Sequence, residues 1–260
     1  MDRCRPALLL ALLLSCGLAQ GAGAPDPLGS PMWDYLRERF LGDDRYRFDD
    51  RVRVELPPFA EDPTQVPVTI DATALKVPVE RILIWADLNP IQHIATLYPL
   101  SDRVAPALSL RIKVQQATVV RAAVLAADGT WYLGGRHIDA AGGGCTAPSQ
   151  AAADPYWESH LGEMQGRLFP PHSPDVSQRA RFRVVHPMDT GLVDGIPEFY
   201  IERARLEDEH SHALMRLELS PPVSENPMLS FDTRGVRELR LWLRDNNGNE
   251  FATGVAAGGE

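Results

Sequence analysis

A single cysteine has the clearest potential for chemistry in this chain. The sequence holds three cysteines, at positions 4, 16 and 145, and the first two lie in an N-terminal segment with the pattern of a secretory signal. Removal of that segment on export would leave Cys145 as the one thiol in an oxidising compartment. A thiol without an intramolecular partner in such a place indicates either an intermolecular bond or a reactive group.

Cys145 follows three consecutive glycines, Gly142, Gly143 and Gly144. Glycine loses more conformational entropy on folding than any other residue, so this run is unfavourable inside a strand or a core. We interpret it as a mobile arm and expect the Cys145 thiol to be solvent-accessible, with variable glycines. Two chains would then join through Cys145 in a disulfide dimer that reductant dissolves. The alternative is an inert cysteine that lies under a linker.

The sequence places no activating base next to this thiol. Arg136 and His137 are the nearest groups that would lower its pKa, and they are several residues away. A nucleophilic enzyme needs a base in contact with the nucleophile, so we expect a carrier whose partner enzymes perform the chemistry, not an enzyme. We assign no catalytic residue and no cofactor.

Three histidine arrangements could in principle bind a metal, and we assign none of them as a metal site. His210 and His212 offer two imidazoles, although a solvated loop between strands explains them better. A copper site built from Cys145 and His137 is a second possibility. His186 lies in a predicted strand before a proline, where a packed or hydrogen-bonded side chain is the favoured interpretation.

The first 24 residues are expected to be a signal peptide and to direct the protein to the periplasm. Arg3 and Arg5 precede an apolar run over residues 7–14, and small residues follow as far as Ala24. This run is shorter than the roughly 20 residues that a bilayer requires, and no later stretch is long enough. A minor alternative is a lipoprotein with a lipidated Cys16.

The charge of the chain argues against a nucleic-acid partner. The net charge is −9 at pH 7, and Lys76 and Lys113 are its only lysines. Phosphate binding needs clustered basic residues, which this composition does not supply. The hydrophobic content of 44% is typical of folded cores and not of disorder.

The periodicity predicts one short helix followed by strands. Ser30 and Pro31 resemble a helix start, Met32, Leu36 and Phe40 have helical spacing, and Gly42 can end the helix. Apolar and polar residues then alternate with a period of two, as in strands. The clearest examples are 66–70, 82–84, 108–114, 182–186, 215–219, 239–243 and 251–255. Asp-Gly at 128–129 and Asn-Asn-Gly at 246–248 predict hairpin turns. The expected fold is mostly β, with two immunoglobulin-like β-sandwich domains.

Several motifs resemble a known family of sulfur carriers. The glycine-rich arm and its cysteine resemble SoxY, and the segments HPMDTG and NPMLSF of the second half resemble its partner SoxZ. The order of the two halves is similar to that of the quinoprotein dehydrogenase-associated SoxYZ-like carriers. The segments that carry the likeness are 32–36, 114–118, 142–148, 186–191 and 226–231.

This resemblance implies a covalent version of a carrier heterodimer. The domains would be a SoxY-like sandwich over 25–145, a linker over 146–166 and a SoxZ-like sandwich over 167–260. It implies a periplasmic carrier with a covalent adduct on Cys145 for periplasmic redox enzymes. The alternative is a non-covalent binding or assembly module for a quinoprotein alcohol dehydrogenase. In the family the arm ends the SoxY chain, whereas here the chain continues after Cys145, so both ends of the arm are tethered.

Overall fold

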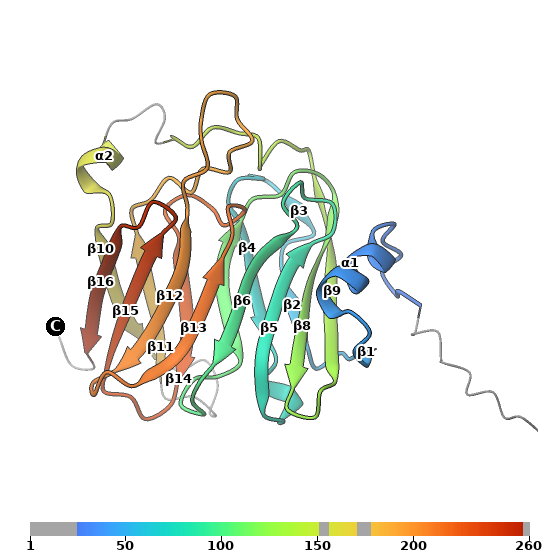
Figure 1. Ribbon diagram of the computed structural model, residues 1–260, viewed down its shortest axis with the longest axis horizontal. Coiled ribbons are helices and arrows are strands. Elements are labelled where there is room, and N and C mark those ends of the chain that lie inside the picture. The colour runs from blue at the N-terminus through green and yellow to red at the C-terminus, as the bar shows by residue number, and fades with distance from the viewer. Residues whose placement is uncertain (1–24, 151–155, 171–177, 257–260) are drawn as a thin grey trace, which may run out of the picture.

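The computed structural model describes residues 25–150, 156–170 and 178–256, and within them the protein is mostly β (Figure 1). The predicted signal peptide and the alternative lipid site at Cys16 lie outside the described residues. The elements are α1 (Trp33–Leu41), β1 (Tyr46–Phe48), β2 (Arg53–Glu55), β3 (Phe59–Ala60), β4 (Val66–Asp71), the 3₁₀ turn η1 (Thr73–Leu75), β5 (Val79–Ala86), β6 (His93–Pro99), β7 (Ala107–Ile112), β8 (Thr118–Ala126), β9 (Trp131–Ala140), α2 (Tyr156–His160), β10 (Met164–Phe169), β11 (Gln178–Val184), β12 (Ile201–Asp208), β13 (Ala213–Leu219), β14 (Met228–Thr233), β15 (Glu238–Asp245) and β16 (Glu250–Ala256).

The strands form two sheets that face each other. Within the described residues, the larger sheet has the order β1-β9-β8-β5-β6-β13-β12-β15-β16, and β3 pairs with β9. The smaller sheet has the order β10-β11-β14-β7-β4-β2. Strands before residue 141 build one half of each sheet, and strands after residue 163 build the other (Figure 1). The expectation of a mostly β sandwich with one short N-terminal helix is confirmed.

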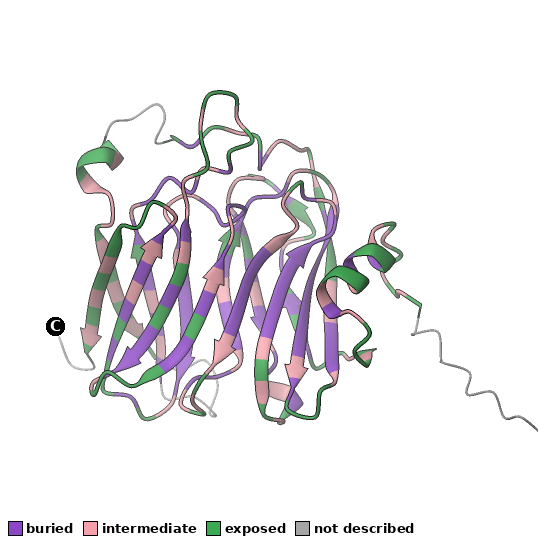
Figure 2. Cartoon of the chain, in the orientation of Figure 1, coloured by how far each residue is buried: buried purple, intermediate pink, exposed green. Residues whose placement is uncertain are grey.

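Both sheets continue across the boundary between the two halves, which we call the seam. In the larger sheet β6 pairs antiparallel with β13, with register from Ala95–Leu219 to Pro99–Met215. In the smaller sheet β7 meets β14 at Ser109 and Ser230. One hydrophobic core of buried residues therefore includes side chains from both halves. Figure 2 shows buried residues on the strands of both halves.

Helix α1 covers the outer face of the first half. Trp33 and Leu36 are buried against a second apolar cluster that contains Trp85 and Trp131. The Gly42 N–H caps the last turn, as the sequence predicted, and Gly42 has a positive φ of 64°. The helix starts at Trp33, later than the Ser30 signal suggested. Ser30 instead accepts the Met32 N–H at 3.3 Å through its hydroxyl.

The predicted alternation is correct for most strands. In β4 the side chains at 66, 68 and 70 are buried, and in β15 those at 239, 241 and 243 are buried. The pattern fails after β7, where Lys113 should point outward but is only 3% exposed. The chain leaves the sheet at Ile112, so the two-residue period no longer decides the direction of the next side chain.

The connection between the halves contains a short helix and the start of a strand. Helix α2 spans Tyr156–His160, and β10 begins at Met164. The boundary expected between 166 and 167 therefore lies inside β10. Among the described residues, no helix is both long enough and apolar enough to cross a membrane.

Candidate functional site

The cysteine arm, residues 141–150, lies at the end of the sandwich where β9 stops (upper edge of Figure 1). It runs back along the backbone that follows β7. The Gly143 N–H donates to the Gln115 carbonyl at 3.0 Å, and the Gly144 N–H donates to the Val114 carbonyl at 3.1 Å. The Thr146 N–H closes a turn onto the Gly143 carbonyl at 3.2 Å. The arm is therefore a hydrogen-bonded turn in this conformation.

The expectation of an accessible thiol on variable glycines is wrong for this conformation. Cys145 has 0% exposure. Gly142 and Gly143 have φ values of 109° and 87°, which other residues rarely adopt. A Cβ on Gly144 would collide with the carbonyl groups of Pro63 and Val114. The glycines therefore allow a tight turn and a close backbone approach.

Both halves of the protein hold Cys145. From the first half, the side-chain oxygen of Gln115 accepts the Cys145 N–H at 3.1 Å. The thiol itself donates to the Lys113 carbonyl, with a sulfur–oxygen distance of 3.7 Å. From the second half, the Thr190 hydroxyl donates to the Cys145 carbonyl at 2.7 Å. Because Thr190 is itself buried, this last bond is shielded from water.

The environment makes the thiol a poor nucleophile. Burial raises the pKa of Cys145 to about 12, and the nearby positive charge of Lys113 offsets this only in part. The thiolate is the reactive form of cysteine, and burial disfavours it. In the conformation described here, the thiol is stored and not presented to a reactant.

The segment HPMDTG, residues 186–191 of the second half, packs against Cys145 and Lys113 of the first half. Met188 has a positive φ of 52°, and its N–H donates to the Nδ1 atom of His186 at 3.1 Å. His186 is completely buried and its ring packs on Phe199, so the predicted packed histidine is confirmed. Burial lowers the pKa of His186 to about 4, although Asp245 opposes this shift. The strained turn aims the Met188 carbonyl at the seam.

Lys113 is the functional candidate that the sequence analysis missed. Its ammonium Nζ donates to the Met188 carbonyl at 2.5 Å, across the seam. Its backbone carbonyl accepts both the Cys145 thiol and the side-chain amide of Asn89, the latter at 2.8 Å. Burial lowers the pKa of Lys113. One signal was present in the sequence, since Lys113 is one of two lysines and lies within the alternating segment 108–114.

The other groups considered from the sequence do not join this site. Arg136 and His137 are exposed on β9, and the nearest carboxylate to His137 is that of Asp139 at 3.7 Å. His210 and His212 are exposed in the β12–β13 turn, where Asp208 accepts both of their backbone N–H groups. Within the described ranges, no group of three or more histidine, cysteine, aspartate or glutamate residues could hold a metal ion.

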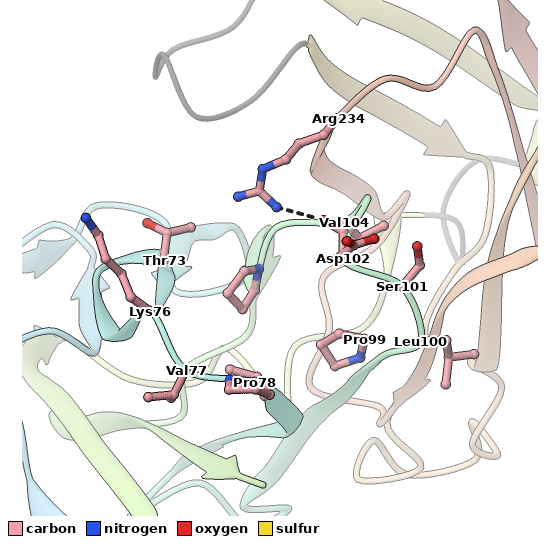
Figure 3. Close-up of a pocket in the computed structure, with 12 residues that line it drawn as sticks. Thr73, Lys76, Val77, Pro78, Pro99, Leu100, Ser101, Asp102, Val104 and Arg234 are labelled. Carbon is pink, nitrogen blue, oxygen red and sulfur yellow. Dashed lines mark hydrogen bonds between the residues drawn. The ribbon is translucent and has the colours of Figure 1, made fainter.

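A hollow of about 610 Å³ lies at the opposite end of the sandwich, beside η1 and the end of β6. Figure 3 shows Lys76 on one side of it and Arg234, from the second half, on the other. The Arg234 guanidinium donates to the Asp102 carbonyl at 2.9 Å. None of the site residues predicted from the sequence lines this hollow.

Comparison with known proteins gives two family matches, one for each half. Residues 37–145 match the family of the sulfur oxidation protein SoxY, and residues 172–256 match that of the sulfur oxidation protein SoxZ. No curated protein matches the chain by sequence.

Two solved structures show weaker similarity. The sulfur carrier protein SoxY from Chlorobium limicola f. thiosulfatophilum is 21% identical over 42% of this chain and 96% of its own, with a TM-score of 0.37. A superoxide reductase (neelaredoxin) from Ignicoccus hospitalis is 12% identical over 36% of this chain and 94% of its own, with a TM-score of 0.32. Both TM-scores are below 0.5, so neither similarity bears on function.

Proposed function

The chain fuses a domain of the SoxY family with a domain of the SoxZ family, and on that premise we propose that it is a periplasmic carrier that holds a sulfur-compound adduct on Cys145 for partner enzymes. One observation carries the proposal. The SoxY match ends at Cys145 itself, and the described contacts of this residue come from both halves. A cysteine that both domains hold is suited to alternate between a stored and a presented state.

The chemistry of loading needs no catalytic base in this chain. A persulfide donor R–S–SH can transfer its outer sulfur to the Cys145 thiol, which gives Cys–S–SH and the free thiol R–SH. The thiolate attacks the outer sulfur, a new S–S bond forms as the old one breaks, and the thiol proton passes to the leaving thiolate. The partner enzyme would supply the base. The raised pKa of Cys145 supports this division of roles, because the closed site does not activate its own thiol.

Carriage requires the arm to leave its place, since a fully buried sulfur cannot reach another protein. The bonds of Cys145 with Gln115, Thr190 and the Lys113 carbonyl must break, and so must the backbone bonds that Gly143 and Gly144 donate. Each neutral hydrogen bond contributes about 0.5–1.5 kcal/mol, so opening costs several kcal/mol and is rare until a partner binds. We propose that these contacts store the empty thiol and protect it from adventitious oxidation.

Intact mass measurement of protein isolated from its native compartment tests the covalent step. We expect a fraction of the wild-type chain to carry extra mass on Cys145, removable by reductant, and none on the Cys145→Ser variant. A chain that always carries an unmodified thiol during growth, together with a Cys145→Ser variant without phenotype, would overturn covalent carriage. The mass of the intact chain also tests the proposed removal of residues 1–24 and the lipidation of Cys16.

We propose periplasmic redox enzymes as the partners, with a quinoprotein dehydrogenase as the first to test. The support for this choice is the motif resemblance over 32–36 and 142–148. Capture of the dehydrogenase by wild-type protein but not by Cys145→Ala would link binding to the carrier cysteine. Equal capture by both forms would instead favour a non-covalent assembly module. Failure of both forms would remove this enzyme as a partner.

A further inference from the structure

The hollow beside η1 and the end of β6 has the dimensions of a ligand site, and the proposed chemistry of Cys145 does not use it. Its volume of about 610 Å³ falls within the roughly 300–1,000 Å³ that small-molecule sites occupy. Arg234 comes from the loop after β14, whereas the other lining residues come from the first half. A molecule bound in the hollow would therefore contact both halves beside the seam.

Hydrogen bonds and prolines fix the walls of this hollow. The loop between β6 and β7 is tied to the second half, since the Ala105 N–H donates to the Asp232 carbonyl at 2.8 Å. The segment before η1 is tied to the same loop, since the Ala72 N–H donates to the Pro106 carbonyl at 3.0 Å. The lining includes three prolines with a restricted φ angle: Pro78, Pro99 and Pro106. Walls of this kind exist before a ligand arrives, so binding requires little ordering of the protein.

The lining combines an apolar surface with two cationic side chains. Valines, prolines and Leu100 supply the apolar surface, and Leu100 is 56% exposed, so its side chain is available to a ligand. Figure 3 shows Lys76 on one side and the Arg234 guanidinium extending over the hollow from the other. The bond of this guanidinium to the Asp102 carbonyl, at 2.9 Å, fixes its position. Ammonium and guanidinium groups both bind carboxylates and other oxyanions.

The backbone and the charge of Lys76 support a role in binding. Lys76 has a φ of 52°, in the left-handed region that residues other than glycine seldom adopt. Strained backbone of this kind is concentrated at ligand sites and other functional positions. Among the residues that the structure describes, the Lys76 ammonium has no hydrogen-bond or ion-pair partner. The acidic lining residue, Asp102, is exposed and screened by water, so the lining holds two cations against one anion.

We propose that this hollow is a binding site for a small organic anion. Its carboxylate or sulfonate would lie near Lys76 and Arg234, and its apolar body would pack on the prolines and Leu100. An inorganic anion would use only the cations, and a neutral apolar molecule would use only the apolar walls. The site lies at the end of the sandwich opposite Cys145, so it acts independently of the proposed carrier cysteine.

Three probes separate these kinds of ligand. Naphthalene-2-carboxylate has both the charge and the apolar body, naphthalene-2-carboxamide has nearly the same shape without the charge, and inorganic sulfate has the charge alone. Titration calorimetry on the mature protein measures each affinity, and backbone amide shifts in NMR locate the bound probe. We expect the carboxylate to bind at least about 5-fold more tightly than the amide, and more tightly than sulfate. The largest shifts should fall on Leu100, Ser101 and Val104, which line the hollow.

Substitutions assign the two parts of the site. Lys76→Met and Arg234→Met should each weaken binding of the carboxylate about 2–5-fold and leave binding of the amide unchanged. Leu100→Ala should weaken binding of both naphthalene probes. Arg136→Met is the matched control, because it removes an exposed cation from β9 outside the hollow, and its affinities should equal those of wild-type protein.

Several results would overturn the proposal. These are no binding of the carboxylate, equal affinities for carboxylate and amide, tighter binding of sulfate, or amide shifts confined to other parts of the molecule. If Arg234→Met does not fold, Lys76→Met decides the role of charge, because its side chain is exposed. The carrier function is tested separately, since Cys145→Ser should abolish any adduct but bind the carboxylate as wild-type protein does.

Discussion

Thr190→Val is the most direct perturbation of the stored arm. Valine keeps the branched shape of threonine but removes the hydroxyl that donates to the Cys145 carbonyl at 2.7 Å. The same hydroxyl accepts the Leu192 N–H at 3.2 Å. The substitution therefore leaves a buried carbonyl without its donor in the closed state, while the open state regains water at that carbonyl. The change acts on the closed arm and not on the chemistry of the thiol.

The expected size of the effect follows from two quantities. Burial raises the pKa of Cys145 from 9.0 to about 12, which lowers the thiolate fraction at pH 7 about a thousandfold relative to an exposed thiol. Wild-type protein should therefore react through rare open arms, or very slowly. Loss of the Thr190 bond costs the closed state about 1–2 kcal/mol, so the open population should rise about 5–30-fold.

Labelling with an aromatic disulfide such as 4,4′-dithiodipyridine measures this change. The rate in Thr190→Val should exceed the wild-type rate by that factor, with both far below the rate of urea-unfolded chain. Thr69→Val is the matched control, because it removes a threonine hydroxyl that bonds Ser109 at 2.9 Å on another part of the molecule. If Thr190→Val labels at the wild-type rate, or wild-type protein labels as fast as the unfolded chain, the stored-arm reasoning is wrong.

Three further predictions test the packing. In Gly144→Ala the new methyl group meets the Pro63 and Val114 carbonyls, so we expect the arm to be expelled and thiol labelling to exceed that of Thr190→Val. Burial lowers the pKa of His186 to about 4, so the unfolded chain binds more protons than the folded one. Urea melts should therefore show stability falling as pH drops from about 6.5 to 4, with a smaller fall in His186→Gln. Arg121→Met leaves the carboxylates of Asp26 and Asp87 without their buried cation and should cost about 3–5 kcal/mol in the same assay; a loss below 1 kcal/mol would contradict this.

The sequence was a good guide to the strands because burial imposes a period of two along each of them. Residues 66–70 and 215–219 alternate as predicted, and both turns predicted from Asp128-Gly129 and Asn246-Asn247-Gly248 connect paired strands. Periodicity carries no information about which strands become neighbours. The pairing of β6 with β13 across the two halves therefore had to come from the structure.

The sequence identified the residues of the candidate site only in part, for a related reason. Cys145 stood out because it is an isolated thiol, and the glycines before it stood out by composition. Their conformation depends on Pro63, Val114 and Gln115, which lie far earlier in the chain. Composition indicates how flexible the backbone of an isolated segment is. Tertiary contacts decide whether that segment is ordered or mobile in the folded protein. The same limit hid Lys113, whose burial depends on a turn of the second half.

The continuity of both sheets through the seam affects how the protein behaves when its concentration is low. Two separate chains that met along β6 and β13 would dissociate on dilution, because their association depends on the concentration of each. The covalent connection makes the same pairing intramolecular, at an effective concentration in the millimolar range for short linkers. Each Cys145 thus stays with its own Thr190 and Met188, at fixed one-to-one stoichiometry, however scarce the protein becomes.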